Sequence, residues 1–399
     1  MMKSYLLGID IGTSACKVAV FDRNGKVLAA ASGDYPVYYP HEGWAEQNPE
    51  EWWDAVCRAT KETIQKADIT ADEIAGIGID GQSWSAIPID REGNVLANTP
   101  IWMDTRAQSI CDRLNQEIGQ EEIFEVAGNS LQPSYSTAKI LWYKENLPEV
   151  YAKIHKILQS NSYIAFKLTD AVTQDVSQGY GLHCFNMKKG CWDEKMCGRL
   201  GIPMEFLPKI CDCDHVVGTV TGKAAAECGL VEGIPVVAGG LDAACGTLGA
   251  GVIHSGETQE QGGQAGGMSI CTEEYKADPR LILSYHVVPG KWLLQGGTTG
   301  GGGVMRWFER EFADYERMMK EQTGVSSLDQ LNKIAEKVGP GCDGMVFLLS
   351  GIHMQRVFSM DWILQKQKDI WSVPVWKGWR FPCGTTLKWQ RKQGQRQMY

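Results

Sequence analysis

Long apolar runs are missing from this sequence, and none approaches the roughly 20 residues that a membrane-spanning helix requires. The first residues, "MMKSYLLGIDIGTS", turn quickly to Gly and Asp, so no secretory leader is expected. Basic residues are in the minority, and the net charge of -9 is unfavourable for binding nucleic acid or an anionic membrane. These absences predict a cytoplasmic protein that binds small molecules and neither nucleic acid nor membrane.

Two common motifs are also absent. The 13 cysteines include no C-x-x-C pair, so "CDCDH", with Cys211, Cys213 and His215, is a weak candidate for a metal site. Cysteines such as Cys57 and Cys228 are expected to be reduced core thiols. No G-x-x-x-x-G-K-S/T motif occurs, so any nucleotide must be held by another kind of loop.

The 399 residues allow two or three domains. Residues 5–33 are predicted to form three strands, with "RNGK" as a hairpin turn. A helix at 49–66 and a buried strand at 74–82 follow. Residues 233–251 predict a strand, a glycine-rich turn and a small-residue helix, and 257–271 and 292–308 repeat a strand and glycine pattern. This order predicts two related α/β lobes that face a cleft.

"GIDIGTSACKV" is a candidate phosphate loop. Gly12 has no Cβ, so backbone amides can approach an anion closely, and Thr13 and Ser14 add hydroxyl donors. Lys17 supplies a positive charge. Asp10, at the end of a strand, is a candidate anchor for Mg²⁺ because hard cations prefer carboxylate oxygens. A plain β-hairpin with a glycine turn is the alternative.

"QGGTTGGGG", residues 295–303, is a second glycine-dense segment. A flexible linker is one interpretation. Apolar strand and helix patterns on both sides favour a backbone that passes close to a nucleotide, with Gly297, Thr298 and Gly300 as candidates.

Asp242, in "GGLDAACG", follows a buried strand and precedes a helix. Ligand sites in α/β folds lie at such strand ends, and a shielded carboxylate there can accept a proton from an alcohol that attacks a phosphate. A helix N-cap is the alternative.

Two further segments follow strand-like runs and are candidates for sugar binding. In "IDGQSWSAIPID", Gln82 and Ser83 can hydrogen-bond sugar hydroxyls and Trp84 can pack on a sugar face. In "IWMDTRA", Asp104 and Arg106 either bind hydroxyls or pair with each other.

Taken together, these motifs resemble the FGGY family of carbohydrate kinases, and the resemblance is nearest to xylulokinase-like members. It runs from about residue 5 to residue 347 and includes "HEGWAEQNPEEWW", "WMDTRA" and "SYSTAKILW", with Lys139 and Trp142 in place. The resemblance implies a duplicated actin-like, ribonuclease-H-like α/β fold with two lobes. It also implies that MgATP phosphorylates a sugar, most simply a ketopentose such as D-xylulose, and that Asp242 is the catalytic base.

The sequence departs from the family pattern at two places. Xylulokinases usually carry Q-M-H-G where this chain has "GQSWS", which leaves the identity of the sugar open. The family's second phosphate loop normally reads G-T-S-G, whereas "EQGGQAGGMS" has no hydroxyl there. Gly262, Gly263 and Gln264 are the residues that would contact phosphate, with Gln264 as a substitute donor.

The composition changes after Phe347. Residues 352–399 contain nine Lys and Arg against two Asp, and five of the 14 Trp, without a helical or strand period. A basic partner-binding tail and a disordered end are two interpretations. A third explains more: a shifted codon frame regenerates a family-like string, "GIFYGL" followed by "HLVRACMEG". We therefore expect residues 348–399 to be an out-of-frame translation.

The predicted organisation is a sugar-binding lobe at 1–243, an incomplete nucleotide-binding lobe at 244–347 and an aberrant tail at 348–399. Low or no kinase activity is expected of such a chain. A catalytically dead sugar-binding module and an actin-like ATPase without a sugar substrate are the alternatives. A homodimer is compatible with the sequence.

Overall fold

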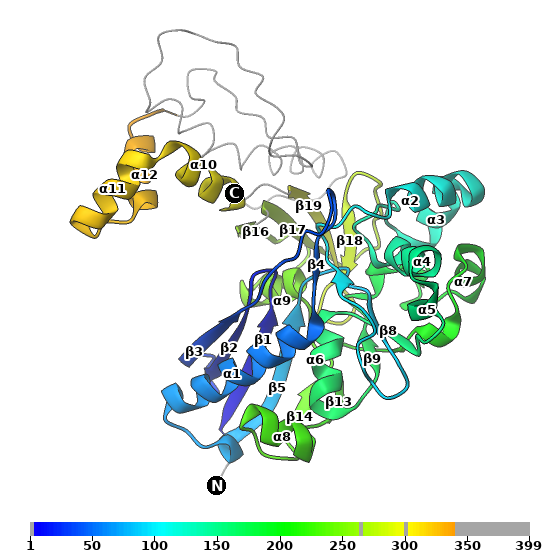
Figure 1. Ribbon diagram of the computed structural model, residues 1–399, viewed down its shortest axis with the longest axis horizontal. Helices are drawn as coiled ribbons and strands as arrows, with labels where there is room; N and C mark the ends of the chain where they lie inside the picture. Colours follow the sequence, from blue (N-terminus) through cyan, green and yellow to red (C-terminus); the bar gives the residue numbers. More distant parts are fainter. Residues whose placement is uncertain (1–3, 263–265, 299–301, 340–399) are drawn as a thin grey trace. The chain divides into compact units, whose positions relative to one another are not determined.

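The computed structural model describes residues 4–262, 266–298 and 302–339 (Figure 1). The chain divides into two compact units. The first consists of Met1–Ile253 and Thr272–Leu294, and the second contains His254–Cys271 and the described part of 295–339. The domain boundaries derived from the sequence stay a prediction, and residues 348–399, the proposed out-of-frame tail, lie outside the described residues.

A twisted sheet organises the first unit. Its strands are β1 (Tyr5–Ile11), β2 (Ala15–Phe21), β3 (Val27–Asp34), β5 (Ile74–Gly81), β13 (Val216–Thr219), β14 (Pro235–Val237) and β15 (Gly240–Leu241). The spatial order is β13-β14-β5-β1-β2-β3, with β15 paired to β5 outside this path. β1, β2 and β3 form an antiparallel meander, and β5 is parallel to β1, β14 and β15. The predicted strands at 5–33 and 74–82 are confirmed.

The helix α1 (Pro49–Ala67) packs on β2 and β3 and begins and ends as its sequence predicts (Figure 1). The Asn48 side chain accepts a hydrogen bond from the Glu50 amide, and Pro49 occupies the first turn, where its missing N–H costs nothing. Its left-handed C-cap, Asp68, has φ 54°. Apolar residues at helical spacing turn one face to the sheet, so the helix is stabilised by packing as well as by its caps.

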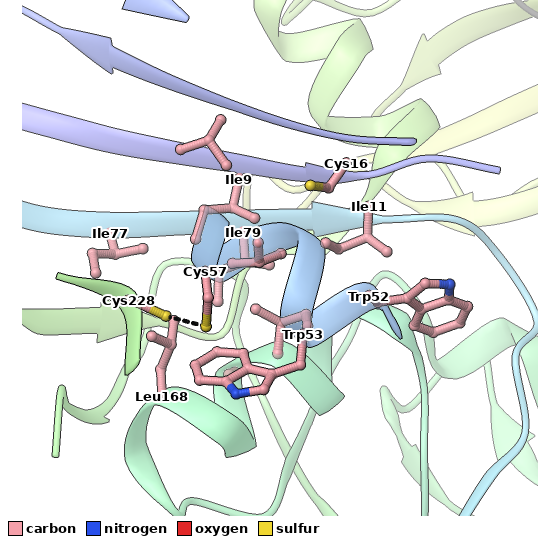
Figure 2. Packing of buried hydrophobic residues seen from close by; sticks show 14 of the residues in the cluster. Ile9, Ile11, Cys16, Trp52, Trp53, Cys57, Ile77, Ile79, Leu168 and Cys228 are labelled. Carbon is pink, nitrogen blue, oxygen red and sulfur yellow. Dashed lines mark hydrogen bonds between the residues drawn. The ribbon is translucent and has the colours of Figure 1, made fainter. Parts of the chain in front are cut away.

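α1 also packs against α6 (Ser160–Thr169) and α8 (Gly222–Cys228), which places residues distant in the sequence in one core (Figure 2). Ile9, Ile11, Ile77 and Ile79 from the central strands are at most 3% exposed. The prediction that Cys57 and Cys228 are core thiols is confirmed, and their sulfurs lie 2.8 Å apart.

A second hydrophobic cluster lies in the same unit and is built mainly by helices. Its helices are α2 (Gln108–Leu114), the π-helical η2 (Asn115–Gly119), α3 (Gln120–Ala127), α4 (Ser136–Asn146), α5 (Pro148–Tyr151) and α7 (Glu194–Leu200). Short paired strands connect them: β4 (Glu46–Gln47) with β7 (Thr99–Pro100), β6 (Ile87–Ile89) with β8 (Lys156–Leu158), β9 (Thr173–Asp175) with β12 (Lys209–Cys211), and β10 (Phe185–Asn186) with β11 (Cys191–Trp192). β18 (Ile282–Tyr285) also belongs to this unit.

The strand β15 leads directly into α9 (Asp242–Gly249), so the predicted strand, glycine turn and small-residue helix at 233–251 are confirmed. Gly239 has φ 72°, in the left-handed region that favours glycine. A Cβ on Gly239 would lie 1.8 Å from the carbonyl oxygen of Ile79. Only glycine therefore allows β15 to approach β5 this closely.

The second unit contains a hairpin in which β16 (Thr258–Gly262) pairs antiparallel with β17 (Gly266–Thr272). β19 (Trp292–Thr298) begins in the first unit and belongs to the second from Gln295 on, and the helices α10 (Gly302–Phe312), α11 (Asp314–Thr323) and α12 (Ser327–Ala335) follow. The predicted strands within 257–271 and 292–308 are confirmed, and strand and helix bound the glycine-rich segment as its flanking patterns predict.

No helix in the described ranges is long and apolar enough to cross a membrane. Within these ranges, too, no cluster of three or more His, Cys, Asp or Glu side chains is arranged to hold a metal ion, "CDCDH" included.

Candidate active site

Three aspartates lie at the carboxyl ends of three adjacent strands of the first unit. Asp10 of β1 and Asp80 of β5 are in register, and Gly240 of β15 lies opposite Asp80. Asp242 follows one residue after the end of this pairing, as the first residue of α9. Neighbouring strands lie about 4.8 Å apart, so these carboxylates share one edge of the sheet. Ligands bind at this edge in open α/β sheets.

We call Asp10, Asp80 and Asp242 the acidic cluster. Burial raises the pKa of Asp80 well above its ordinary value, and the charges of Asp10 and Asp242 raise it further. Burial also raises the pKa of Asp242 from 3.8 to about 7, and the charge of Asp10 adds to this rise. Hydrogen bonding from the Ala243 amide, 2.6 Å from Oδ1, opposes it. The acidic cluster therefore favours binding of a proton or a cation.

One positive charge lies beside the acidic cluster. Lys17 of β2 is in register with Asp10, and its Nζ is 2.9 Å from Oδ2 of Asp10. The hydrogen bond to Asp10 raises the pKa of Lys17, so this ammonium stays charged. Its side chain is 70% exposed, so the pair adds little to stability. The exposed ammonium is instead available to an anion.

The turn between β1 and β2 is held in place by its carbonyl groups. Tyr35 Oη donates to the Gly12 carbonyl at 2.6 Å, and Gln47 Nε2 donates to the Thr13 carbonyl at 2.9 Å. Trp102 Nε1 donates to Thr13 Oγ1 at 3.0 Å. Within the described part of the chain, the amides of Thr13 and Ser14 donate to no acceptor. The turn thus combines a fixed conformation with two unengaged N–H groups, as an anion site requires.

Gln47 links this turn to the segment that follows β5. Its Oε1 accepts a hydrogen bond from Gln82 Nε2 at 2.9 Å. Gln82 is 1% exposed, and its own Oε1 has no hydrogen-bond partner among the described residues. A buried acceptor without a donor is costly, so Gln82 Oε1 is a good candidate to accept a hydrogen bond from a ligand hydroxyl.

Trp84 adopts a left-handed backbone conformation with φ 62°, which is rare for a bulky residue and is often found at functional sites. Its ring stacks on Tyr135 with centroids 4.2 Å apart and meets Tyr180 edge-on at 5.8 Å. The hydroxyl of Tyr180 donates to Ser83 Oγ at 3.1 Å. Gln82, Ser83 and Trp84 are thus brought together, and one face of Trp84 is covered by Tyr135.

Lys139 supports the unusual backbone of Trp84. Its Nζ donates to the carbonyls of Trp84 and Ile101, each at 2.8 Å, and the side chain is fully buried. Burial lowers the pKa of Lys139 to about 7, and the nearby charge of Asp104 opposes this shift. The lysine that carries the family resemblance is therefore a structural support for residues 82–84, which we call the sugar segment after the binding role predicted for it.

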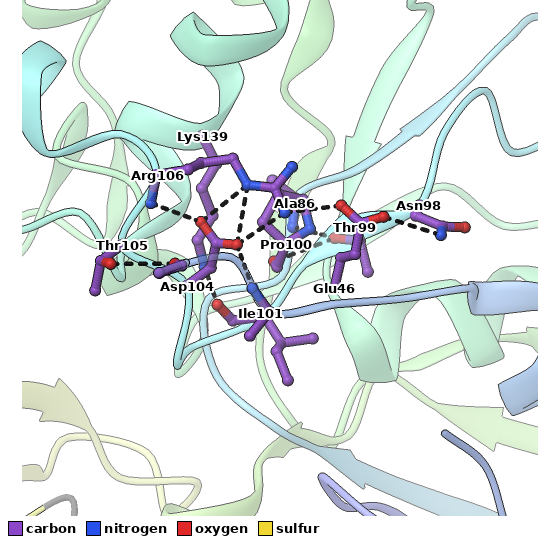
Figure 3. A network of polar contacts seen from close by, with 12 residues as sticks. Glu46, Ala86, Asn98, Thr99, Pro100, Ile101, Asp104, Thr105, Arg106 and Lys139 are labelled. Atoms are coloured by element: carbon purple, nitrogen blue, oxygen red, sulfur yellow. Dashed lines mark hydrogen bonds and ion pairs between the residues drawn. The ribbon is translucent and has the colours of Figure 1, made fainter. Parts of the chain in front are cut away.

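The structure brings Asp104 and Arg106 together in a closed network (Figure 3). Asp104 is 0% exposed and accepts hydrogen bonds from the Ala45 amide at 2.7 Å and from Arg106 Nε at 2.9 Å. Arg106 also pairs with Glu46 at 2.7 Å, and its guanidinium lies 3.8 Å from the ring centroid of Trp44. Of the two alternatives open at the sequence level, the mutual pair is the one that forms. Direct contact of either side chain with a sugar stays a prediction.

The interpretation of Asp242 as an N-cap is not the arrangement that forms. Leu241 occupies the N-cap position, and no side-chain capping hydrogen bond is present there. The carboxylate of Asp242 therefore does not cap α9, and its contact there is the hydrogen bond that it accepts from the Ala243 amide.

Sequence reasoning missed Asp80, and it also missed Tyr135 and Tyr180 beside Trp84. A signal for Asp80 exists: a glycine, an apolar residue and an aspartate occur at 8–10, at 78–80 and at 240–242. Each of these triplets ends one of the three strands that carry the acidic cluster.

The candidate phosphate contacts of the second unit are described only in part. Gly262 ends β16 opposite Gly266, and Gly297 and Thr298 end β19. A Cβ on Gly267 would lie 3.3 Å from the Gly296 carbonyl oxygen, so the backbones of β17 and β19 are close there. Gly263, Gln264 and Gly300 lie outside the described residues.

The site combines three features: a constrained turn with unengaged backbone amides, an acidic cluster at strand ends, and a neighbouring segment with the Gln82 amide and the Trp84 ring. This combination is typical of an α/β phosphotransferase. Comparison with known proteins agrees. Residues 5–249 match the N-terminal domain of the FGGY family of carbohydrate kinases. The chain is 30% identical over 345 residues to the xylulose kinase of Bacillus subtilis (strain 168), an alignment that covers 86% of this chain and 67% of the relative. It is also 30% identical over 347 residues to the gluconokinase of Bacillus licheniformis, covering 87% and 67%.

Among solved structures, the xylulose kinase from Rhodospirillum rubrum matches with a TM-score of 0.85 and 25% identity, covering 99% of this chain and 80% of that chain. The chain belongs to the FGGY family of carbohydrate kinases. It is an ATP-dependent sugar kinase, and its fold class is the actin-like, ribonuclease-H-like α/β fold of that family.

Proposed function

We propose that this kinase phosphorylates a neutral sugar, most simply a ketopentose such as D-xylulose, with Asp242 as the general base. The position of Asp242 carries the proposal: it lies at a strand end beside Asp10 and Lys17, with a pKa raised to about 7 by burial. A general base is most effective when its pKa is near the working pH.

In the proposed reaction, Asp242 accepts the proton of the sugar hydroxyl as the hydroxyl oxygen forms a bond to the γ-phosphorus of ATP. The bond from that phosphorus to the β,γ-bridging oxygen breaks, and ADP leaves. Lys17 and the amides of Thr13 and Ser14 are suited to bind the phosphate oxygens, since they supply positive charge and fixed N–H groups.

Mg²⁺ is the metal we propose for this site, held by Asp10 and Asp80. Carboxylate oxygens suit a hard cation, and Lys17 alone does not balance three carboxylates. Mg²⁺ is usually bound by one or two carboxylates together with substrate phosphates, so two ligands from the protein are enough. When bound, it would neutralise charge on the phosphates.

The sugar contacts that we propose are Gln82, Ser83 and Trp84. The unpartnered Gln82 Oε1 supports this assignment because it can accept a hydrogen bond from a hydroxyl. Ser83 offers a hydroxyl beside it, and Trp84 an apolar edge. Asp104 and Arg106 are then best explained as structural supports, since each is engaged in the closed network with Ala45 and Glu46.

A neutral sugar is favoured over a sugar acid, although a gluconokinase is as similar to the chain as a xylulose kinase is. A carboxylate substrate needs a cation to compensate for its desolvation. Near Trp84, Arg106 is paired with Asp104 and Glu46, and Lys139 is buried on two carbonyls. Neither cation is available to a substrate carboxylate in this arrangement.

The test is a coupled assay of ADP release with a version of the chain whose reading frame is restored after codon 347, MgATP and either D-xylulose, D-gluconate or no sugar. Release that depends on D-xylulose supports the proposal. Equal release without sugar would favour an ATPase, and binding of sugar without release would favour a dead sugar-binding module. Preference for gluconate by more than about tenfold would show that the assignment of a neutral sugar is wrong.

We also infer that this particular chain has low or no activity, because the composition of residues 348–399 does not fit a nucleotide-binding lobe. A homodimer and a cytoplasmic location remain predictions.

A further inference from the structure

We propose that Asp175 and Ser177 are positioning residues, which hold the strand end before Asp242 and thereby set the distance of its carboxylate from the rest of the acidic cluster. This inference rests on the proposed role of Asp242. Neither residue belongs to the acidic cluster or to the sugar segment, and neither follows from the motifs that identify the family.

Asp175 lies at the end of β9, is 1% exposed, and is surrounded by donors. Oδ1 accepts hydrogen bonds from Ser177 Oγ at 2.5 Å and from the Gln178 amide at 2.9 Å. Oδ2 accepts from Asn161 Nδ2 at 2.8 Å and from Gln174 Nε2 at 3.1 Å. A buried carboxylate with four donors is well satisfied and rigid, so it is a fixed reference point inside the unit.

Ser177 links the Asp175 carboxylate to the backbone of the candidate active site. Its Oγ donates to Asp175 and at the same time accepts a hydrogen bond from the Leu241 amide at 2.9 Å. Leu241 is the residue immediately before Asp242. A chain of two hydrogen bonds of this kind polarises both members and strengthens each. The backbone that carries the proposed base is therefore anchored to a buried charge.

The approach of Ser177 to β15 is close. A Cβ on Gly240 would lie 2.9 Å from Ser177 Oγ and 2.7 Å from Val287 Cγ1. Because Gly240 has no side chain, the end of β15 can approach the Ser177 hydroxyl. Gly240 and Ser177 together determine the position of the end of β15. A displacement of a few tenths of an ångström here would move Asp242 directly.

Two of the residues that donate to Asp175, Gln178 and Asn161, also hydrogen-bond the backbone near the ends of β5 and β15. Gln178 Nε2 donates to the carbonyls of Gly81 and Gln82 at 3.0 and 3.2 Å. Asn161 Nδ2 donates to the carbonyl of Ala238 as well as to Asp175. The turn after β9 thus ties the ends of β5 and β15 to one point. This arrangement opposes the mutual repulsion of Asp80 and Asp242, which would otherwise separate the two strand ends.

The first experiment does not depend on activity. Melting temperatures of the wild type, Ser177→Ala, Asp242→Asn and the double variant are measured at pH 8.5 in the full chain. If Ser177 holds the Asp242 carboxylate close to Asp10 and Asp80, Asp242→Asn relieves repulsion and raises the melting temperature of the wild type. In the Ser177→Ala background, where the carboxylate is less constrained, the same substitution should raise the melting temperature by less than half as much. Thr63→Val is the matched control, because it also removes one buried hydroxyl donor, to the Val18 carbonyl, and neither residue belongs to the acidic cluster or to the turn between β1 and β2. Equal gains in the wild-type, Ser177→Ala and Thr63→Val backgrounds would overturn the proposal.

The second experiment measures turnover on the same variants in a version of the chain with the reading frame restored after codon 347. Ser177→Ala is expected to lower kcat about 10- to 100-fold and to change KM for the sugar and for ATP by less than about threefold, because misplacement of a base affects the chemical step. Asp175→Asn is expected to lower kcat in the same way. Thr63→Val should keep the kcat of the wild type per folded molecule. A wild-type kcat in Ser177→Ala, or a loss confined to KM, would overturn the proposal, whereas absence of turnover in the frame-restored wild type would count against the proposed function alone.

Discussion

Replacement of Asp242 by Asn should stabilise the folded protein at alkaline pH while it abolishes phosphoryl transfer. Burial and the charge of Asp10 raise the pKa of Asp242 from 3.8 to about 7. The folded state therefore binds a proton more tightly than the unfolded state. Between about pH 4 and pH 7 the wild type loses stability as the pH rises, and above pH 7 the loss is complete. Asparagine removes this penalty.

The size of the effect follows from the pKa shift. A shift of roughly three units, at about 1.36 kcal/mol per unit, sets an upper limit of about 4 kcal/mol. Asp242 is only partly buried, so solvent screening reduces this, and we expect a gain of about 2 kcal/mol at pH 8.5. At pH 5 most of the wild-type carboxylate is protonated in the folded state, and the gain should fall below about 1 kcal/mol.

Urea unfolding of both proteins at pH 5 and pH 8.5 measures this gain directly. Asp34→Asn, a substitution in an exposed strand position, is the control for any general effect of a lost negative charge. If Asp242→Asn is no more stable than the wild type at pH 8.5, or if its gain does not change with pH, the environment assigned to Asp242 is wrong.

Three further outcomes are expected. In calorimetry with D-xylulose, Trp84→Ala and Gln82→Leu should each weaken binding by about 1–3 kcal/mol, because a ring contact or a hydroxyl partner is lost, and unchanged affinity in both would place the sugar elsewhere. Asp104→Ala should lower the free energy of unfolding by about 3 kcal/mol, since it leaves the buried Arg106 guanidinium without one of its two carboxylate partners, and a cost below about 1 kcal/mol would contradict the closed network. A version with the reading frame restored after codon 347 should exceed the given chain in turnover and in melting temperature; comparable values for both would show that residues 348–399 are a genuine part of the protein.

The strands β1, β2, β3 and β5, the helix α1 and the turn into α9 could be predicted because these elements carry local signals. Alternating apolar residues mark β1, β2 and β5, and Asn48 with Pro49 marks the start of α1. The general position of Asp242 also followed from a local pattern, a buried strand before a helix.

Residues whose roles depend on distant partners could not be predicted in the same way. Whether Arg106 is free or paired is decided by Glu46 and Trp44, about 60 residues earlier in the chain. Burial raises the pKa of Asp80, and the charges of Asp10 and Asp242, which the pairing of β1 and β15 with β5 brings close, raise it further. Local pattern defines an element, whereas charge and burial at its end are set by neighbours that long-range pairing brings together.

The acidic cluster has a consequence for the way the chain folds during synthesis. Its members are supplied by residues 10, 80 and 242, so the third carboxylate is translated long after the first two. β1, β2, β3, β5 and α1 can assemble before residue 242 exists, and at that stage only two of the repelling charges are present. Docking of β14 and β15 on β5 closes the longest loop of the sheet, and β15 brings in the third charge, which makes this a slow step. We therefore expect ribosome-bound chains that end near residue 215 to bury Trp52 already, and native-like protease resistance of the segment around Ser177 to develop only after residue 242 has emerged.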